Sequence, residues 1–277
     1  MLIDAHQHFW IYEPAQYEWI DESMAALRRD FLPADLDSAM KLCGVDGTVA
    51  VQARQSLEET RWLLALAERS KKILGVVGWV DLCSANLHSE LAEFAGHSKF
   101  VGFRHIVQGE ADDQFLLRPD FLRGIAALEE FDLAYDLLIY PRHLPVAAEF
   151  VSRFPRQRFV LDHMAKPHIR SGEIDSWSRG IRELAAFSNV CCKLSGLITE
   201  ADWSNWKPAE ITPYLNVVFE AFGPDRLMIG SDWPVCLVAG SYERTLDVVK
   251  DYLEPYDTGV RTAILGGNAQ RFWGLQV

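Results

Sequence analysis

The chain has 277 residues, of which 49% are hydrophobic and 24% charged, a balance typical of a folded domain with a large core rather than a disordered chain. Acidic residues outnumber Lys and Arg by 39 to 27, and the resulting net charge of −12 argues against nucleic acid as a partner. No apolar run approaches the roughly 18 residues of a membrane span, so we expect no membrane partner either.

All five cysteines are expected to be reduced thiols. Their number is odd, none is spaced as Cys-x-x-Cys, and most lie in apolar runs typical of strands. Disulfide frameworks belong to oxidising compartments, so this pattern favours a cytoplasmic location. The five residues are Cys43, Cys83, Cys191, Cys192 and Cys236.

Short β-branched and apolar runs recur along the chain, each followed by a loop or by a stretch with helical periodicity. This alternation is typical of a parallel sheet built from βα units. The eight predicted strands cover residues 2–6, 47–52, 73–80, 100–105, 133–139, 158–162, 190–194 and 226–230. Helical patterns cover residues 57–69, 87–94, 121–131, 144–154, 176–187, 211–222 and 242–253.

The predicted strands follow one another at near the roughly 30 residues of a βα unit, and no linker, charge block or repeat divides the chain. We therefore predict a single domain over residues 1–277. An open doubly wound sheet is the alternative, but it would usually carry a Gly-rich phosphate loop after its first strand, where this chain has His-Gln-His. A closed (β/α)8 barrel of the α/β class is favoured.

The active site of such a barrel lies at the carboxyl ends of the strands, so the polar residues that end each strand carry the functional signal. The first predicted strand runs into Asp4-Ala5-His6-Gln7-His8. Because side chains alternate along a strand, we expect Asp4, His6 and His8 on one face. Two imidazoles side by side suit a metal ion or a polarised carbonyl.

Two further predicted strands end in residues of related chemistry. The sixth delivers Asp162 and His163, and the eighth delivers Ser231, Asp232 and Trp233 ahead of a proline. Because strand ends converge in a barrel, His163 and Asp232 are predicted to meet the two histidines of the first strand. The apolar strand before Asp232 favours a buried, functional carboxylate over a helix cap.

Other residues near the strand ends are candidates for ligand contact. Arg104 shares a strand face with Gly102 and is predicted to point into the barrel mouth, where a guanidinium can grip a carboxylate, a hydroxyl pair or a carbonyl oxygen. Trp79 and Trp233 are candidates for stacking on an apolar ring face. For Lys193, an ion pair with a buried acid and a contact with substrate are both open. The remaining candidates at the mouth are Gln52, Arg54, Asp81 and Tyr140.

Six motifs occur in a defined order: Asp4-Ala5-His6-Gln7-His8-Phe9-Trp10, Gly102-Phe103-Arg104-His105, Leu161-Asp162-His163 with Lys166-Pro167, Lys193-Leu194-Ser195-Gly196, Gly230-Ser231-Asp232-Trp233-Pro234 and Gly267-Asn268-Ala269. In this combination the chain resembles the amidohydrolase superfamily. Within it, the chain resembles the sugar-lactonase branch of L-fuconolactonases and L-rhamnonolactonases, which is related to 2-pyrone-4,6-dicarboxylate lactonase. The resemblance runs from residue 2 to residue 275.

The resemblance implies a distorted (β/α)8 barrel that hydrolyses a lactone ring at the first-strand histidines, the sixth-strand histidine and the eighth-strand aspartate. Binuclear members of the superfamily use a carboxylated lysine after strand four and a histidine after strand five, where this chain has Arg104-His105 and Tyr140-Pro141. A two-metal centre is therefore not expected. The resemblance makes one Zn²⁺ or other divalent cation optional rather than required. Its ligands would be His6, His8, His163 and Asp232.

We predict a hydrolase that opens a sugar-acid lactone of the L-fucono- or L-rhamnonolactone type, with Asp232 accepting the proton of the attacking water. His6, His8 and His163 are assigned to the carbonyl and its oxyanion. Predicted substrate contacts are Arg104, His105, Gln52, Arg54, Trp79, Tyr140 and Trp233. The alternatives are a dicarboxylate pyrone lactonase, a metal-dependent decarboxylase of the same superfamily and a noncatalytic sugar-acid binding protein. Nothing in the sequence selects an oligomeric state.

Overall fold

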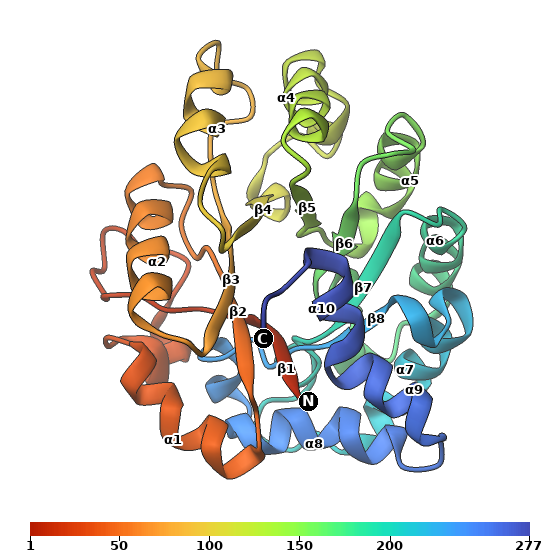
Figure 1. Ribbon diagram of the computed structural model, residues 1–277. Helices are drawn as coiled ribbons and strands as arrows, with labels where there is room; N and C mark the ends of the chain where they lie inside the picture. Colours follow the sequence, from red (N-terminus) through yellow and green to blue (C-terminus); the bar gives the residue numbers. More distant parts are fainter.

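The computed structural model describes residues 1–277 as one sheet of eight parallel strands in the order β1 to β8, surrounded by helices (Figure 1). The strands are β1 Ile3–Gln7, β2 Gly47–Val51, β3 Ile73–Gly78, β4 Phe100–His105, β5 Ala134–Leu137, β6 Phe159–Leu161, β7 Val190–Leu194 and β8 Leu227–Ile229. The helices are α1 Pro33–Cys43, α2 Leu57–Arg69, α3 Leu87–Ala95, α4 Pro119–Glu130, α5 Leu144–Ser152, α6 Asp175–Ala185, α7 Pro208–Phe222, α8 Tyr242–Leu253, α9 Thr258–Thr262 and α10 Asn268–Trp273. The predicted (β/α)8 class is confirmed.

The barrel closes between the end of β1 and the segment after β8, which we call the closing seam (residues 6–8 and 232–233). The amide of Asp232 donates to the carbonyl of His6 at 2.8 Å, and the amide of His8 donates to the carbonyl of Trp233 at 2.6 Å. A parallel bridge between Gln7 and Trp233 joins the two edges. Both bonds lie at the carboxyl end of the barrel, where the predicted site residues also lie.

Apolar side chains fill the barrel at its amino end. Val49, Val77 and Val160 belong to this inner cluster, and Phe272 and Trp273 of α10 pack against it. Figure 1 shows α10 lying across that end of the barrel, close to both chain termini. Since the amino end is plugged by apolar packing, only the carboxyl end is left to hold a ligand.

The first strand contains a bulge that turns one predicted side chain away from the site. Between Asp4 and Gln7, three steps along β1 match two along β2, which breaks the alternation of side chains. Asp4 therefore points outward and accepts hydrogen bonds from Tyr242 Oη of α8 at 3.1 Å and Ser231 Oγ at 2.6 Å. His6 instead faces the barrel interior. The expectation that Asp4 shares a face with the two histidines is wrong.

None of the helices combines the length and the continuous apolar character that crossing a bilayer requires. All five cysteines are free thiols, as predicted, and Cys192 and Cys236 are buried.

A buried carboxyl group on α2 provides a pH-dependent test of this fold. Glu59 Oε2 accepts the amides of Ala53 and Arg54 at 3.0 and 2.8 Å, and burial raises the pKa of Glu59 from 4.5 to about 7. Native protein therefore binds more protons than unfolded protein between pH 4.5 and 7, so this group makes the free energy of unfolding fall as pH rises through that window.

The Glu59→Gln variant is expected to lack this slope. Relative to wild type, its free energy of unfolding should rise by up to about 3 kcal/mol between pH 4.5 and pH 8. Urea denaturation at several pH values measures the difference, with Glu58→Gln at the exposed neighbour as the matched control. Parallel pH dependence in wild type and Glu59→Gln would refute the assignment.

Candidate active site

Three histidines and one aspartate meet at the carboxyl end of the barrel, each from the end of a strand. Asp232 Oδ1 lies 3.3 Å from His8 Nε2 and 3.8 Å from both His6 Nε2 and His163 Nε2. The Nε2 atoms of His6 and His8 are 3.1 Å apart. All four side chains are buried. The predicted convergence of residues from β1, β6 and β8 is thus what the fold produces.

The turn after β6 places His163 in the site through an unusual backbone conformation. Residues 163–166 all have positive φ, from 50° to 57°, although none is glycine. The imidazole packs on Gly196, where a Cβ atom would come within 2.8 Å of the ring. His163 Nδ1 lies 2.8 Å from Ser195 Oγ, so the end of β7 orients this ring.

The electrostatics of the cluster favour neutral imidazoles around an ionised carboxylate. Burial lowers the pKa of His6 and His8 and brings that of His163 to about 4. Burial alone would raise the pKa of Asp232, but the surrounding histidines hold it below its ordinary value. A carboxylate that stays ionised beside neutral donors and acceptors is suited to accept a proton from water.

The hydrogen-bond partner of His8 determines which nitrogen of its ring carries the proton. Its Nδ1 lies 2.7 Å from the backbone carbonyl of Val51, which can only accept a hydrogen bond. Neutral His8 therefore carries its proton on Nδ1 and presents the lone pair of Nε2 to Asp232. This nitrogen can accept a hydrogen bond from water or bind a metal, but it cannot donate to an oxyanion.

Below the histidines lies a buried network of two cations and two anions. Lys193 Nζ pairs with Asp136 Oδ2, lies 2.9 Å from Asp162 Oδ1 and 3.1 Å from His6 Nδ1. Burial raises the pKa of Asp136 to about 7, whereas Lys193, His6 and Arg104 hold that of Asp162 well below its ordinary value against the effect of burial. Of the two roles left open for Lys193, the structure shows the ion pair.

Arg104 completes this network rather than projecting free donors. Its five N–H groups reach Gln52, Asp162 and His6, the Nη1 atom lying 3.1 Å from Asp162 Oδ2 and 3.3 Å from His6 Nε2. The guanidinium lines a cavity at the carboxyl end of the barrel, but a direct hydrogen bond to substrate would have to replace one of these contacts. Its predicted grip on substrate stays a prediction.

The nitrogen and oxygen atoms of the cluster are also placed to bind one divalent metal ion. The side chains of His6, His8 and Asp232 bring their ligand atoms within 4.8 Å of one another. Separations of 3.1 to 3.8 Å are close to the roughly 3.3 Å between ligands of a tetrahedral zinc with bonds of about 2.0–2.2 Å. One Zn²⁺ therefore fits, although the charge of Arg104 beside His6 opposes a cation.

A cavity of about 310 Å³ opens above this cluster. Its floor contains His8, His163 and Asp232, and its walls combine polar and apolar groups. The wall residues are Trp19, Ala53, Arg104, Ile106, Gln108, Gly109, Leu138, Tyr140, Lys166 and Val235. Trp19 is 40% exposed and packs edge-on against Trp10, which makes its ring the indole available for stacking on a ligand.

Several predicted contact residues lie outside the cavity lining. Trp79 donates to His105 Nδ1 at 3.3 Å, and His105 in turn bonds Glu110 at 2.7 Å. Trp233 is buried against Phe9 and Phe31, Arg54 bonds Gln16, Gln52 holds Arg104, and Asp81 is exposed on a turn. Of the predicted set, Arg104 and Tyr140 do line it. Trp19, Gln108 and Lys166 are wall residues that the sequence patterns missed.

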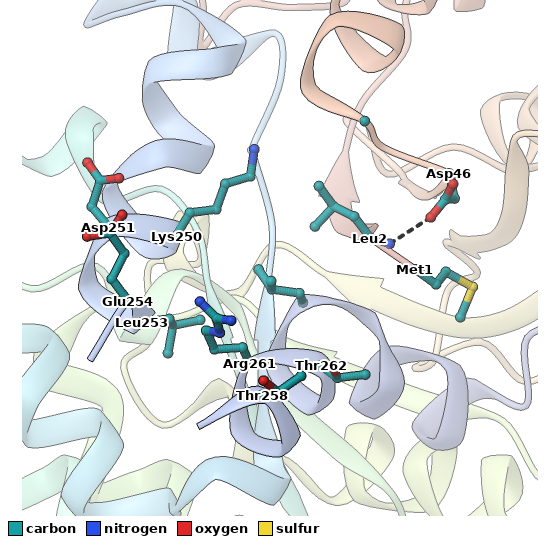
Figure 2. A pocket seen from close by; sticks show the side chains of 12 residues that line it. Met1, Leu2, Asp46, Lys250, Asp251, Leu253, Glu254, Thr258, Arg261 and Thr262 are labelled. Carbon is teal, nitrogen blue, oxygen red and sulfur yellow. Dashed lines mark hydrogen bonds between the residues drawn. The ribbon is translucent and has the colours of Figure 1, made fainter. Parts of the chain in front are cut away.

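Volume alone does not identify the site. A hollow of about 480 Å³ lies at the opposite end of the barrel. Figure 2 shows the side chains that line it, with the hydrogen bond from the amide of Leu2 to Asp46 at its edge. Charges of both signs surround it, including Lys250, Arg261 and Glu254, and these side chains are exposed or half-buried. It contains no buried cluster of titratable groups, so the cavity above Asp232 is the candidate active site.

Comparison with known proteins places this site in a family context. The family model described as amidohydrolase matches residues 3–275. An L-fucono-1,5-lactonase of Burkholderia multivorans is 43% identical over 99% of this chain and 96% of its own length, and one of Burkholderia ambifaria is 41% identical over 99% and 95%. A crystal structure of an amidohydrolase from Burkholderia multivorans with bound zinc superposes with a TM-score of 0.96 at 43% identity, covering all of both chains.

Proposed function

The chain belongs to the amidohydrolase family, and from this membership and the geometry of the site we propose that it hydrolyses L-fucono-1,5-lactone or a closely related sugar-acid lactone, with Asp232 as the general base. Sugar-acid lactone hydrolysis rests on the full-length similarity to the two L-fucono-1,5-lactonases. The role of Asp232 rests on one observation: an ionised carboxylate at the cavity floor, with an acceptor nitrogen of His8 3.3 Å away.

The floor residues divide the chemistry between them. His8 Nε2 and Asp232 both accept, so together they can hold the two O–H groups of a water molecule. As that water bonds to the lactone carbonyl carbon, Asp232 takes its proton. The bond from this carbon to the ring oxygen then breaks, and Asp232 returns the proton to the leaving oxygen, which becomes a hydroxyl group.

The third imidazole is placed to assist the carbonyl oxygen. His163 Nδ1 can accept from the Ser195 hydroxyl, and the proton then resides on Nε2, which faces the cavity. An N–H donor at this point stabilises negative charge that develops on the carbonyl oxygen. A zinc ion bound by His6, His8, His163 and Asp232 would supply a Lewis acid for the same carbonyl.

The charges of the cavity favour a neutral lactone over a dicarboxylate pyrone. A dicarboxylate needs two cationic grips. Arg104 has its donors occupied, and Arg54, the other candidate for a second grip, bonds Gln16 and lies outside the lining. Lys166 is then the cation in the lining with free donors.

A lactone screen with a pH indicator tests the proposed function. We expect kcat/KM for L-fucono-1,5-lactone to exceed that for 2-pyrone-4,6-dicarboxylate by at least about tenfold, because one carboxylate of the pyrone would lack a partner. Higher kcat/KM for the pyrone, or no opening of any sugar lactone by folded protein, would overturn the proposal.

Metal content is expected to be at most about one equivalent per chain. There are two groups of possible ligands, one of His6, His8 and Asp232 and one of His6, Asp162 and His163, and both require the same His6. Elemental analysis of protein purified with added zinc measures the ratio. His8→Asn should remove the bound metal, and His88→Asn, at an exposed histidine, is the control. Two equivalents that depend on His8 would contradict a single site.

Free thiols at all five cysteines support a reducing compartment, and we extend the proposal to a cytoplasmic enzyme.

A further inference from the structure

Lys166 occupies a position on the cavity wall that the proposed reaction has not yet used. It is the last of the four residues with positive φ, and this turn places Lys166 beside His163 in the lining of the same cavity. Its Nζ lies 5.8 Å from the ring centre of Tyr140, which also lines the cavity. The Lys166 side chain is 20% exposed, so it can meet a ligand without unfolding of the turn.

The ammonium group of Lys166 has unused hydrogen-bonding capacity. Its charged neighbour is Glu200, whose Oε1 is 3.9 Å away, beyond the 3.5 Å limit of a hydrogen bond. The two other cations near the site are committed: Arg104 has partners for all of its donors, and Lys193 is fully buried between Asp136 and Asp162. Lys166 thus supplies the free positive charge in the cavity.

Opening of the lactone ring produces a carboxylate, which a free positive charge in the cavity can bind. A neutral lactone and a water molecule enter and give a carboxylic acid, which releases its proton to solvent. The resulting carboxylate lies next to the ionised Asp232, and two like charges in a buried site repel each other. Lys166 lines the same cavity as His163 and Asp232, so its charge acts on the region where this carboxylate forms. Gln108 Oε1 is also buried in the cavity wall without a partner and can accept from a hydroxyl of the sugar chain.

We propose that Lys166 is a substrate-binding residue whose ammonium takes the carboxylate of the hydrolysed sugar acid, with Glu200 as the resident counter-ion that weakens this grip and lets the product leave. The inference rests on the proposed lactone hydrolysis, because it concerns the product of that reaction. No bond is made or broken at Lys166: the carboxylate exchanges places with Glu200 as the partner of the ammonium.

Calorimetry with two ligands tests whether Lys166 binds the carboxylate by its charge or only shapes the cavity. The two ligands are L-fuconate, which is charged, and L-fucitol, which is not. In Lys166→Met, affinity for L-fuconate should fall by about 10- to 100-fold, while affinity for L-fucitol changes less than about threefold. Lys166→Arg should restore most of the L-fuconate affinity. Lys72→Met, at an exposed lysine paired with Asp37, is the matched control.

Glu200→Gln provides a test in the opposite direction. Removing the counter-ion should tighten L-fuconate binding several-fold and increase product inhibition of lactone hydrolysis, with little effect on L-fucitol. The proposal is overturned if Lys166→Met weakens both ligands equally or neither, or if Glu200→Gln fails to tighten L-fuconate.

Failure of this inference is distinguishable from failure of the proposed function. If wild-type protein opens no sugar lactone, the proposed function itself is wrong. If wild type opens L-fucono-1,5-lactone and Lys166→Met binds L-fuconate as wild type does, only the role of Lys166 is wrong.

Discussion

Replacing Asp232 by asparagine is expected to lower kcat for lactone hydrolysis by about 10²- to 10⁴-fold, with little change in KM. The amide keeps the shape of the side chain but cannot take a proton from water, so the proton-transfer step loses its base. Steady-state kinetics on L-fucono-1,5-lactone measure the effect, and far-UV circular dichroism checks the fold.

Asp225→Asn is the matched control for this experiment. Asp225 is exposed just before β8, at the opposite end of the strand that Asp232 follows, so the same substitution there should leave kcat unchanged. If Asp232→Asn retains near-normal kcat while His163→Asn abolishes activity, then His163 is the base and the assigned roles are reversed.

The largest expected effect on stability comes from Lys193. Lys193→Met leaves Asp136 and Asp162 buried without their shared cation, and breaking a buried ion pair in this way costs about 3–5 kcal/mol. Urea denaturation measures the loss. The double variant Lys193→Met/Asp136→Asn removes one of the stranded charges as well and should recover a substantial part of it.

This double variant also distinguishes loss of the ion pair from poor packing of the new methionine. If Met at position 193 only packs badly, adding Asp136→Asn will not restore stability, and the two losses will simply add. A single-variant loss below about 1 kcal/mol would show that the network contributes little to folding.

The strands could be predicted because each is a short apolar run, and the histidines of the first strand, His163 and Asp232 could be found because barrel sites lie at strand ends. Helix α1 was missed because it buries few apolar residues, chiefly Leu36 and Met40, so its periodicity is weak. Helices α9 and α10 have only five and six residues, so they are too short to show the periodic spacing of apolar residues that indicates a helix.

The directions of some side chains and the contacts made by loops could not be predicted from the sequence, for physical reasons. A bulge inverts the face of Asp4, and bulges depend on pairing with a distant strand rather than on local residues. Trp19 lies in an irregular segment between β1 and α1, where no periodicity assigns a direction. The pairing of Lys193 with Asp136 joins residues 57 apart in the chain, which neither strand reveals alone.

The closing seam links the proposed role of Asp232 in catalysis to the completion of folding. The backbone bond that brings Asp232 to His6 joins residues more than two hundred positions apart, the first strand with the end of the last. Contacts of such separation carry a high loop-closure cost and tend to form late. A nascent or truncated chain that lacks β8 has the histidines of β1 without their carboxylate. Regain of activity during refolding therefore reports closure of the barrel itself, whereas helix formation can be complete before any turnover begins.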